Sequence, residues 1–345
     1  MYSSQVVVPC DELQSTVDWF LANTGFRMVL IRPADDPSIA VLDGYGISIR
    51  LDREAADGPS SLLLAVDELP SDRVVTAPNG TVIQFVLSDP PFDLPPNRSE
   101  FVSSRSADAD FSTGRAGMTY RDLIPARQGG RFIASHIRIP EGGPVPDYVH
   151  HHHIRFQMIF CHQGWADLVY EDQGPQFRFE AGDCVLQPPH IRHRVLATSD
   201  AFEVVEIGCP AEHDTLRDNE MTLPTSSIDR DRDFGGQRFV WHRAASAVAD
   251  PWHSPGFDFI NFGIDQATDG LATVGIVRAG EEAEIGSFSN DSEFLFWFVR
   301  AGAATLTRNG EDSPIGPRDA ITFAPDETYS LTDVSPDLEL LEVKL

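Results

Sequence analysis

The stretch HHHHIRFQMIFCHQG, residues 150–164, decides the fold together with AGDCVLQPPHIRH, residues 181–193. Short apolar runs between glycines and prolines are typical of short strands joined by tight turns. Side chains alternate across a strand, so His150 and His152 project to one face while His151 and His153 project to the other. The pattern predicts a mainly β protein in which one strand presents two imidazoles on the same face.

These residues indicate a metal site. Two imidazoles from one strand, with one group from each of two neighbouring strands, can converge inside a small jelly-roll barrel. We predict that His150, His152, Gln157 and His193 bind one divalent metal ion. Ring nitrogens bind metals in their neutral form, so metal occupancy should fall as the pH drops through the histidine range.

The spacing closely resembles that of the cupin family. The first cupin motif is a Gly followed by His-x-His, three or four residues, Glu, six residues and Gly; the second is Gly-Asp, a short strand, Pro and a final His. The matching residues here are Gly143, His150, His152, Gln157, Gly164, Gly182, Asp183, Pro188 and His193. The resemblance implies a jelly-roll barrel with one metal ion, which would be Fe2+, Zn2+, Ni2+ or Mn2+.

A second register stays open. His151-x-His153, with three residues before Gln157, also satisfies the spacing of the family. We interpret His190 as a group near or at the rim of the site, and His136 and His162 as ordinary strand residues. The remaining histidines outside both motifs receive no role: His213, His242 and His253.

Gln157 stands where cupins more commonly have Glu. A carboxylate would cancel one unit of the metal's charge, whereas an amide carbonyl cancels none and leaves the ion a stronger Lewis acid. Glutamine also occurs here in some cupins that open or isomerise sugar-acid rings, while three-histidine cupins include dioxygenases. The ligand set therefore permits both redox and non-redox chemistry.

We hypothesise a metal-dependent enzyme that acts on a small oxygenated organic molecule. Resemblance to ring-cleaving bicupins of the gentisate type favours a dioxygenase that cleaves a ring or a C–C bond. Two alternatives remain: a non-redox isomerase or lyase of a sugar acid, and a non-catalytic cupin that binds a small molecule. Arg138 and Arg155 are candidate anchors for an anionic substrate, since arginine is suited to carboxylate binding.

A second block of sequence repeats the first. FLFWFVRAGAATLT and PRDAITFAPDETY match the segments around Gly164 and Gly182 at an offset of 136 to 138 residues. The offset places Phe288, Asn290, Leu295 and Tyr329 at the four ligand positions. The sequence therefore predicts a degenerate second cupin that binds no metal.

The first 90 residues follow another pattern. A strand at Val6–Pro9, a helix starting near Asp11 and three strands within residues 26–51 resemble one module of the vicinal-oxygen-chelate, or glyoxalase, family. Strands at 62–66 and 81–87 look like a second module with a shrunken helix. The metal ligands of that family are absent, because Gln5 and Gln84 stand at the corresponding strands. We predict a metal-free lobe.

Composition completes the domain prediction. Residues 1–90 form the glyoxalase-like lobe, 91–113 a linker, 114–213 the metal-binding cupin, 214–236 a linker and 237–345 the degenerate cupin. Lys+Arg 26 against Asp+Glu 53 gives a net charge of −27, which disfavours nucleic acid and membrane surfaces as partners. Four scattered cysteines and the absence of a signal pattern predict reduced thiols and a cytoplasmic location. The expected partners are a small-molecule substrate and a second copy of the chain in a homodimer.

Overall fold

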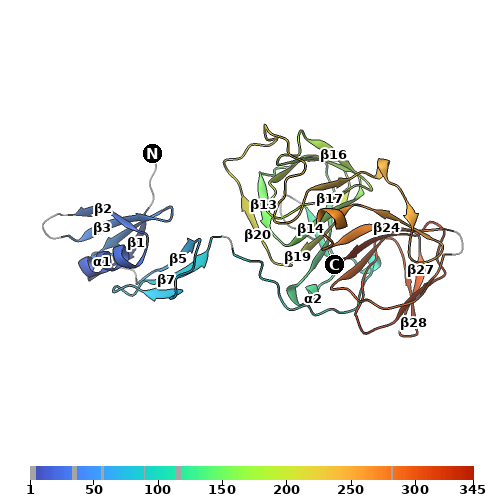
Figure 1. Cartoon of the computed structure of the whole chain (residues 1–345), viewed down its shortest axis with the longest axis horizontal. Helices are drawn as coiled ribbons and strands as arrows, with labels where there is room; N and C mark the ends of the chain where they lie inside the picture. Colours follow the sequence, from blue (N-terminus) through green and yellow to red (C-terminus); the bar gives the residue numbers. More distant parts are fainter. Residues whose placement is uncertain (1–4, 33–36, 56–57, 89, 114–117, 281–282) are drawn as a thin grey trace. The chain divides into compact units, whose positions relative to one another are not determined.

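The structure of the protein is a computed structural model that describes residues 5–32, 37–55, 58–88, 90–113, 118–280 and 283–345. The chain divides into two compact units, residues 1–91 and residues 92–345 (Figure 1). Strands dominate both units, in agreement with the predicted class. No helix in the described parts of the chain is long and apolar enough to span a bilayer.

The first unit contains a strand, a helix and three strands in the predicted order. Its four-stranded sheet has the order β1-β4-β3-β2, with β1 parallel to β4, and its second sheet has the order β5-β7-β6. Phe20 of the helix, Leu42 and Ile83 belong to one core that joins both sheets. The elements are β1 (Val6–Pro9), α1 (Leu13–Asn23), β2 (Arg27–Arg32), β3 (Ile39–Gly44), β4 (Ile47–Asp52), β5 (Ser61–Val66), β6 (Val74–Thr76) and β7 (Val82–Leu87).

The second unit contains two β-barrels. The first barrel packs a seven-stranded sheet, β21-β17-β14-β19-β11-β10-β9, against the sheet β16-β15-β18-β13-β20, with β12 beside β18. Its elements are β9 (Ser112–Thr113), β10 (Thr119–Asp122), α2 (Arg127–Gly130), β11 (Ile133–Ile139), β12 (Gly143–Pro144), β13 (His150–His153), β14 (Phe156–Gln163), β15 (Trp165–Tyr170), β16 (Phe177–Glu180), β17 (Cys184–Leu186), β18 (His193–Thr198), β19 (Phe202–Cys209), β20 (Asp214–Arg217) and β21 (Val240–His242).

The second barrel repeats this plan with the sheets β22-β23-β24-β31-β26-β29-β8 and β25-β30-β27-β28. A core that includes Phe160 and Phe298 joins the seven-stranded sheets of the two barrels. The elements are β8 (Val102–Ser104), β22 (Asp250–Pro251), β23 (Phe257–Asn261), α3 (Ile264–Ala267), β24 (Thr273–Ala279), β25 (Ile285–Phe288), β26 (Leu295–Ala301), β27 (Ala304–Arg308), β28 (Glu311–Ile315), β29 (Ala320–Thr322), β30 (Tyr329–Thr332) and β31 (Glu339–Lys344). Short 3-10 turns lie at Ser106–Asp108 and Ala244–Ser246.

The two barrels exchange their first strands. β8 precedes the first barrel in the chain but pairs with β29 of the second barrel, with Ser104 opposite Ala320. β21 precedes the second barrel but pairs with β17 of the first, with His242 opposite Cys184. Both exchanged strands occupy matching positions of the repeat, which gives the duplication a structural counterpart.

Both segments predicted as linkers contain strands. Residues 91–113 contain β8 and β9, and residues 214–236 begin with β20, which pairs along the whole histidine strand β13. These strands are only two to four residues long and largely polar, so they carry no periodic pattern, and their partners are distant in the sequence. The 114–117 part of the first cupin lies outside the described residues.

Candidate metal centre

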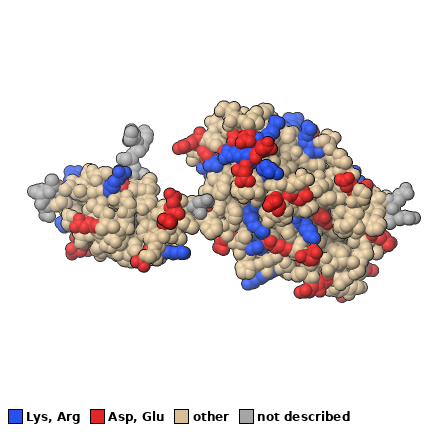
Figure 2. Space-filling model, viewed as in Figure 1, with Lys and Arg blue, Asp and Glu red and all other residues tan. Residues whose placement is uncertain are grey.

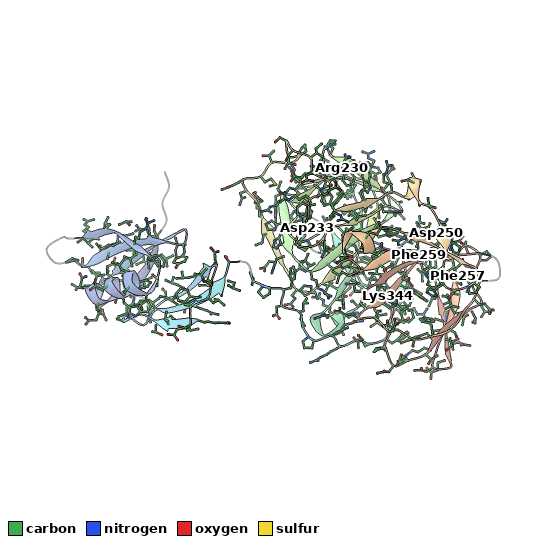
Figure 3. The ribbon with its side chains drawn as sticks, viewed as in Figure 1. Arg230, Asp233, Asp250, Phe257, Phe259 and Lys344 are labelled. Carbon is green, nitrogen blue, oxygen red and sulfur yellow. The ribbon has the colours of Figure 1, made fainter. Side chains whose placement is uncertain are left out.

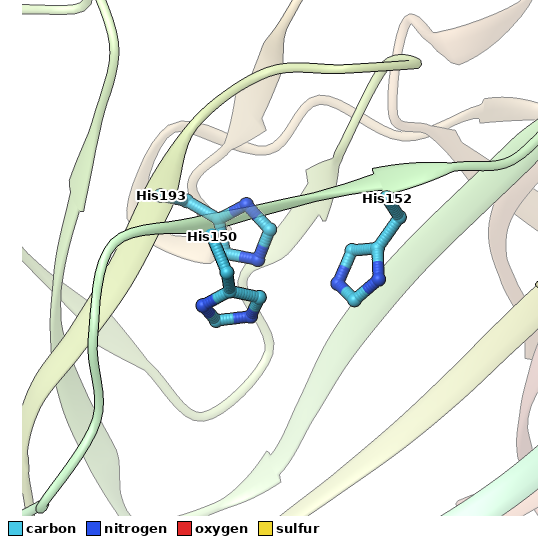
Figure 4. A group of neighbouring side chains, drawn as sticks. All are labelled: His150, His152 and His193. Atoms are coloured by element: carbon cyan, nitrogen blue, oxygen red, sulfur yellow. The ribbon is translucent and has the colours of Figure 1, made fainter. Parts of the chain in front are cut away.

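Two neighbouring strands bring three histidines together. His150 on β13 lies directly opposite His193 on β18, and their ring centroids are 4.3 Å apart. His152 follows on the same face of β13, with its ring centroid 5.3 Å from that of His193. One nitrogen of each ring lies within 4.8 Å of the others (Figure 4). Ligands about 2.1 Å from one ion lie about 3 to 4 Å apart, so small rotations of the rings would close the site.

The second nitrogen of each ring has a hydrogen-bond partner that fixes the ring. His150 Nδ1 lies 2.8 Å from the Tyr148 carbonyl and His193 Nδ1 3.0 Å from the Ile191 carbonyl. His152 Nδ1 lies 3.0 Å from the hydroxyl of Thr215 on β20. A carbonyl oxygen only accepts, so the Nδ1 of His150 and His193 carries the proton and Nε2 carries the lone pair. The histidines therefore fit a divalent metal ion.

Gln157 lies beside these histidines in a hydrogen-bonded row. Its Nε2 donates to Glu206 Oε1 at 2.6 Å, and its Oε1 accepts from Gln187 Nε2 at 3.0 Å. The Tyr170 hydroxyl donates to Gln187 Oε1, and burial raises the pKa of that hydroxyl, so it keeps its proton. An amide oxygen has two acceptor positions, so the bond to Gln187 leaves Gln157 with the capacity to be a ligand.

The three histidines line a cavity of about 330 Å³ inside the first barrel. Its walls are mainly apolar and include Ile137, Leu168 and Phe179. The polar lining residues besides the histidine triad include Tyr120, Ser135, Gln157, Tyr170, Gln187, Glu206, His213 and Thr215. Sequence reasoning missed Glu206, a single acid in the apolar stretch FEVVEIGC, and it gave His213 no role.

The outward histidines form a different group. His151 and His153 both face His190, with ring centroids 5.6 and 5.2 Å from it, and Phe92 stacks on His153 at 4.8 Å. Burial lowers the pKa of His151 to about 4, with a further lowering from Arg192. The structure thus gathers His150, His152 and His193 in the cavity and places the alternative pair on the opposite face of β13.

The two predicted substrate anchors lie elsewhere. Arg155 donates from Nη1 to Glu293 of the second barrel at 3.1 Å, and Arg138 lies 3.2 Å from the carboxylate of Glu203. Neither residue lines the cavity. Arg155 and Glu293 stand at matching positions of the two repeats, so this pair links the barrels. Carboxylates of the chain pair with both guanidinium groups, so the structure gives no support to Arg138 and Arg155 as substrate anchors, and that role stays a prediction.

His136 and His162 lie near the junction of the barrels. His136 Nε2 lies 2.9 Å from Glu203 Oε2, which also accepts from Arg318 Nε of the second barrel at 3.0 Å. Burial alone would raise the pKa of Glu203, but hydrogen bonds from His136 and Arg318 outweigh it and lower the pKa to about 2. Burial lowers the pKa of His162 to about 4. These histidines support the junction of the barrels.

The second barrel has other residues at the ligand positions. Phe288 pairs with Tyr329 as His150 pairs with His193. The side chain of Asn290 bonds to the Phe323 carbonyl and to Ser292, so it stabilises a loop. Within the described residues, the triad of the first barrel is the only cluster of three metal-binding side chains.

Comparisons with known proteins agree with this architecture. Residues 135–207 match the family described as "Cupin domain". Oxalate decarboxylase from Lactobacillus farciminis, solved as a formate complex, superposes with a TM-score of 0.53 at 10% identity, covering 70% of this chain and 85% of that one. Oxalate decarboxylase from Bacillus subtilis at pH 4.6 gives 0.51 at 11% identity, covering 71% and 76%.

No curated protein matches the chain. Similarity at this level of identity establishes the fold and leaves the reaction to be argued from the site. The glyoxalase-like assignment of residues 1–90 stays a prediction. The match of residues 135–207 to the cupin domain family and the two-barrel superposition together show that the chain contains a cupin domain and has a bicupin fold.

Proposed function

We propose that the protein is a metal-dependent cupin enzyme that acts on a small oxygenated organic molecule. The observation that carries the proposal is the position of His150, His152 and His193 in the wall of a mainly apolar cavity of about 330 Å³. Cavities of this size enclose small molecules. A bound divalent ion would supply Lewis acidity, and as Fe2+ it would also supply reactivity toward O2.

The cavity walls favour a substrate with an apolar body. Ile137, Leu168 and Phe179 offer contact surface without hydrogen-bond donors. Of the charged lining residues, Glu206 would repel a carboxylate placed beside it and Arg194 would attract one. The oxygen atoms of the substrate would therefore lie near the histidines, and its ring or chain would lie along the apolar walls. Tyr170 and Gln187 hold Gln157 in place from the side of β15 and β17.

We favour oxygen-dependent cleavage of a ring or C–C bond as the reaction. Three neutral imidazoles and a neutral amide leave a bound ion with its full charge, which favours chelation of an anionic, electron-rich substrate. Apolar walls protect reactive species from water. Glu206 hydrogen-bonds to Gln157 and would orient this amide toward the open positions of the site.

A non-redox isomerase or lyase is the second candidate, and Glu206 is the observation that supports it. A carboxylate in the cavity can accept a proton from a substrate carbon next to a polarised carbonyl. The superposed oxalate decarboxylases also cleave a C–C bond of a small organic acid, as their names state. The third reading, a cupin that binds a small molecule without reacting, predicts affinity without turnover.

Oxygen uptake separates these candidates. The purified protein is loaded separately with Fe2+, Mn2+, Ni2+ and Zn2+, and each form is mixed with gentisate, related hydroxylated acids, sugar acids and oxalate in an oxygen-electrode cell. Uptake of one O2 per substrate by the Fe2+ form, lost in His152→Ala and retained in His151→Ala, supports the dioxygenase. Turnover by the Zn2+ form without O2 would refute the dioxygenase and support the isomerase or lyase. Binding without any product supports the non-catalytic reading.

A further inference from the structure

The second barrel also contains a cavity. Its volume is about 380 Å³, and it lies where the metal site lies in the first barrel, because Phe288, Asn290 and Leu295 border it at three of the former ligand positions. Loss of the ligands has therefore not filled the barrel. The remaining lining residues include Trp252, His253, Phe259, Ile285, Asp291, Trp297, Glu342 and Lys344.

One buried acid has been kept in this cavity. Glu342 lies opposite Trp297 on neighbouring strands, as Glu206 lies opposite Ile159 in the first barrel. Glu342 is only 9% exposed, and its Oε2 accepts a hydrogen bond of 2.8 Å from the indole nitrogen of Trp297. Burial raises the pKa of Glu342, and the hydrogen bond from Trp297 and the charge of Lys344 offset this only in part, which reflects the cost of a carboxylate held away from water. A cation bound beside it would offset that cost.

The walls of the cavity are aromatic. Trp297 and Phe288 lie with their centroids 5.6 Å apart, while Trp252 and Phe259 add rings from the β22–β23 hairpin. Phe259 and Lys344 are labelled in Figure 3, on the strands β23 and β31. Aromatic faces attract organic cations, most strongly where water is excluded.

The charges at the cavity also favour a cation. Lys344 is the one lysine or arginine of the lining, and its Nζ pairs with Asp291 Oδ1 at 2.9 Å. Burial lowers the pKa of His253, so this ring is neutral at pH 7. Two carboxyl groups against one ammonium give the lining an acidic balance, and the whole chain carries −27. A second carboxylate held beside Glu342 would be repelled by it, so the local charges disfavour an anionic ligand.

We propose that the second barrel is a metal-free binding site for a small organic cation, an amine or quaternary ammonium compound with an apolar body. Glu342 would pair with the cationic head, and the rings of Trp252, Phe288 and Trp297 would surround it. This site is independent of the metal centre in the first barrel. The degenerate barrel would then have exchanged a metal for an organic ligand.

Three probes that share a phenyl ring test the charge preference. Benzylammonium, benzyl alcohol and benzoate are titrated separately into the full-length protein, and binding is followed by calorimetry and by tryptophan fluorescence. Benzylammonium should bind at least tenfold more tightly than benzyl alcohol, and benzoate should not bind. Equal affinity for the cation and the alcohol, preference for benzoate, or no binding of benzylammonium would each overturn the proposal.

Two variants locate the site. Glu342→Gln keeps the shape of the side chain and the acceptor for Trp297. It should lower the affinity for benzylammonium at least tenfold and change the affinity for benzyl alcohol less than twofold. Glu206→Gln, at the matching position of the first barrel, should leave both affinities unchanged. The opposite pattern would place the probe in the first barrel and refute the proposal.

A rim variant covers the case in which Glu342→Gln does not fold. Trp252 is half-buried at the edge of the cavity, so Trp252→Leu should still fold. The affinity of this variant for benzylammonium should fall several-fold, while the metal content of the protein stays the same. Unchanged affinity for benzylammonium in this variant would contradict the aromatic site.

Discussion

At the scale of single residues, the metal centre depends on the groups that hold its histidines. The Nδ1 atoms of His150 and His193 lie at backbone carbonyls, and the Nδ1 of His152 lies at a side chain, the hydroxyl of Thr215. The hydroxyl can accept the Nδ1 proton of His152 and so present Nε2 to the ion. Loss of such a hydrogen-bond partner commonly lowers metal affinity by about 10- to 100-fold.

We therefore predict that Thr215→Val lowers the affinity for Zn2+ by about 10- to 100-fold, because valine keeps the shape of threonine but cannot accept the hydrogen bond of His152. Thr215→Ser keeps the hydroxyl and should bind Zn2+ as the natural chain does. Competition with a chromophoric chelator measures both affinities. Equal affinities in the valine and serine variants would show that the hydroxyl does not hold His152.

His162 makes stability depend on pH. Its folded pKa of about 4 lies below the ordinary value of 6.5, because burial and then Arg318 disfavour the charged ring. The unfolded chain therefore takes up a proton below pH 6.5 that the folded chain takes up only near pH 4. Stability falls as the pH drops from 6.5 to 4, by about 2 kcal/mol from this group between pH 7.5 and 5.

Urea unfolding of the natural chain and of His162→Gln, at pH 7.5 and pH 5, checks this effect. The variant has no ring to titrate, so it should lose about 2 kcal/mol less stability on acidification. The comparison cancels the contributions of groups that do not contact His162. An identical loss in both proteins would show that His162 is protonated to the same extent in the folded and unfolded states.

At the scale of elements, the exchange of β8 and β21 joins the barrels. Asp183 of the first barrel accepts hydrogen bonds from the Trp241 indole and the Ala244 amide, both just beyond or within β21. Asp319 does the same for Arg105 and Ser106 beside β8. The Gly-Asp motif, which the sequence analysis used only for its spacing, thus holds the exchanged strand in the first barrel.

We predict that Asp183→Asn destabilises the protein by about 2 kcal/mol, since the amide cannot replace both charge-assisted acceptors. Thermal unfolding measures the loss. Asp167→Asn is the matched control, because Asp167 pairs with the exposed Arg178 on the barrel surface. This variant should lose much less stability than Asp183→Asn. Equal losses in the two variants would show that the exchanged strand is not held through Asp183.

The elements differ in how well the sequence predicts them. Alternation in HHHH places His150 and His152 on one face of β13, and the repeat offset predicts which residues replace the ligands. The sequence does not predict β8, β20 and β21, because they are three or four residues long and each pairs with a strand far away in the sequence. The sequence also does not predict the roles of Glu206 and Thr215 in the site. The alternation along a strand shows on which face a side chain lies but not which cavity it lines.

At the scale of the whole molecule, charge and exposed apolar surface bear on association. On the side of residues 92–345 shown in Figure 2, acidic and basic side chains are interspersed and form no single-sign patch. In the first unit, β2 is an edge strand, and its residues Met28, Val29, Leu30 and Ile31 are 41 to 56% exposed. An exposed apolar edge is a ready template for pairing with another chain.

We predict that the protein is a homodimer and that β2 contributes to the contact. Light scattering on a sizing column should give twice the chain mass of 38.0 kDa. Val29→Lys, which places a charge on the edge, should shift the protein toward monomer, while Ser15→Lys on the exposed side of α1 should not. A monomeric natural chain, or a dimer unaffected by Val29→Lys, would contradict this assignment.

The central claim is that one barrel binds metal and the other does not. Elemental analysis of protein purified without added metal, then reconstituted with Zn2+ and desalted, tests it most directly. We predict about one equivalent per chain in the natural protein and in His151→Ala, and almost none in His152→Ala. Two equivalents in the natural protein, or one retained in His152→Ala, would contradict a single site at His150, His152 and His193.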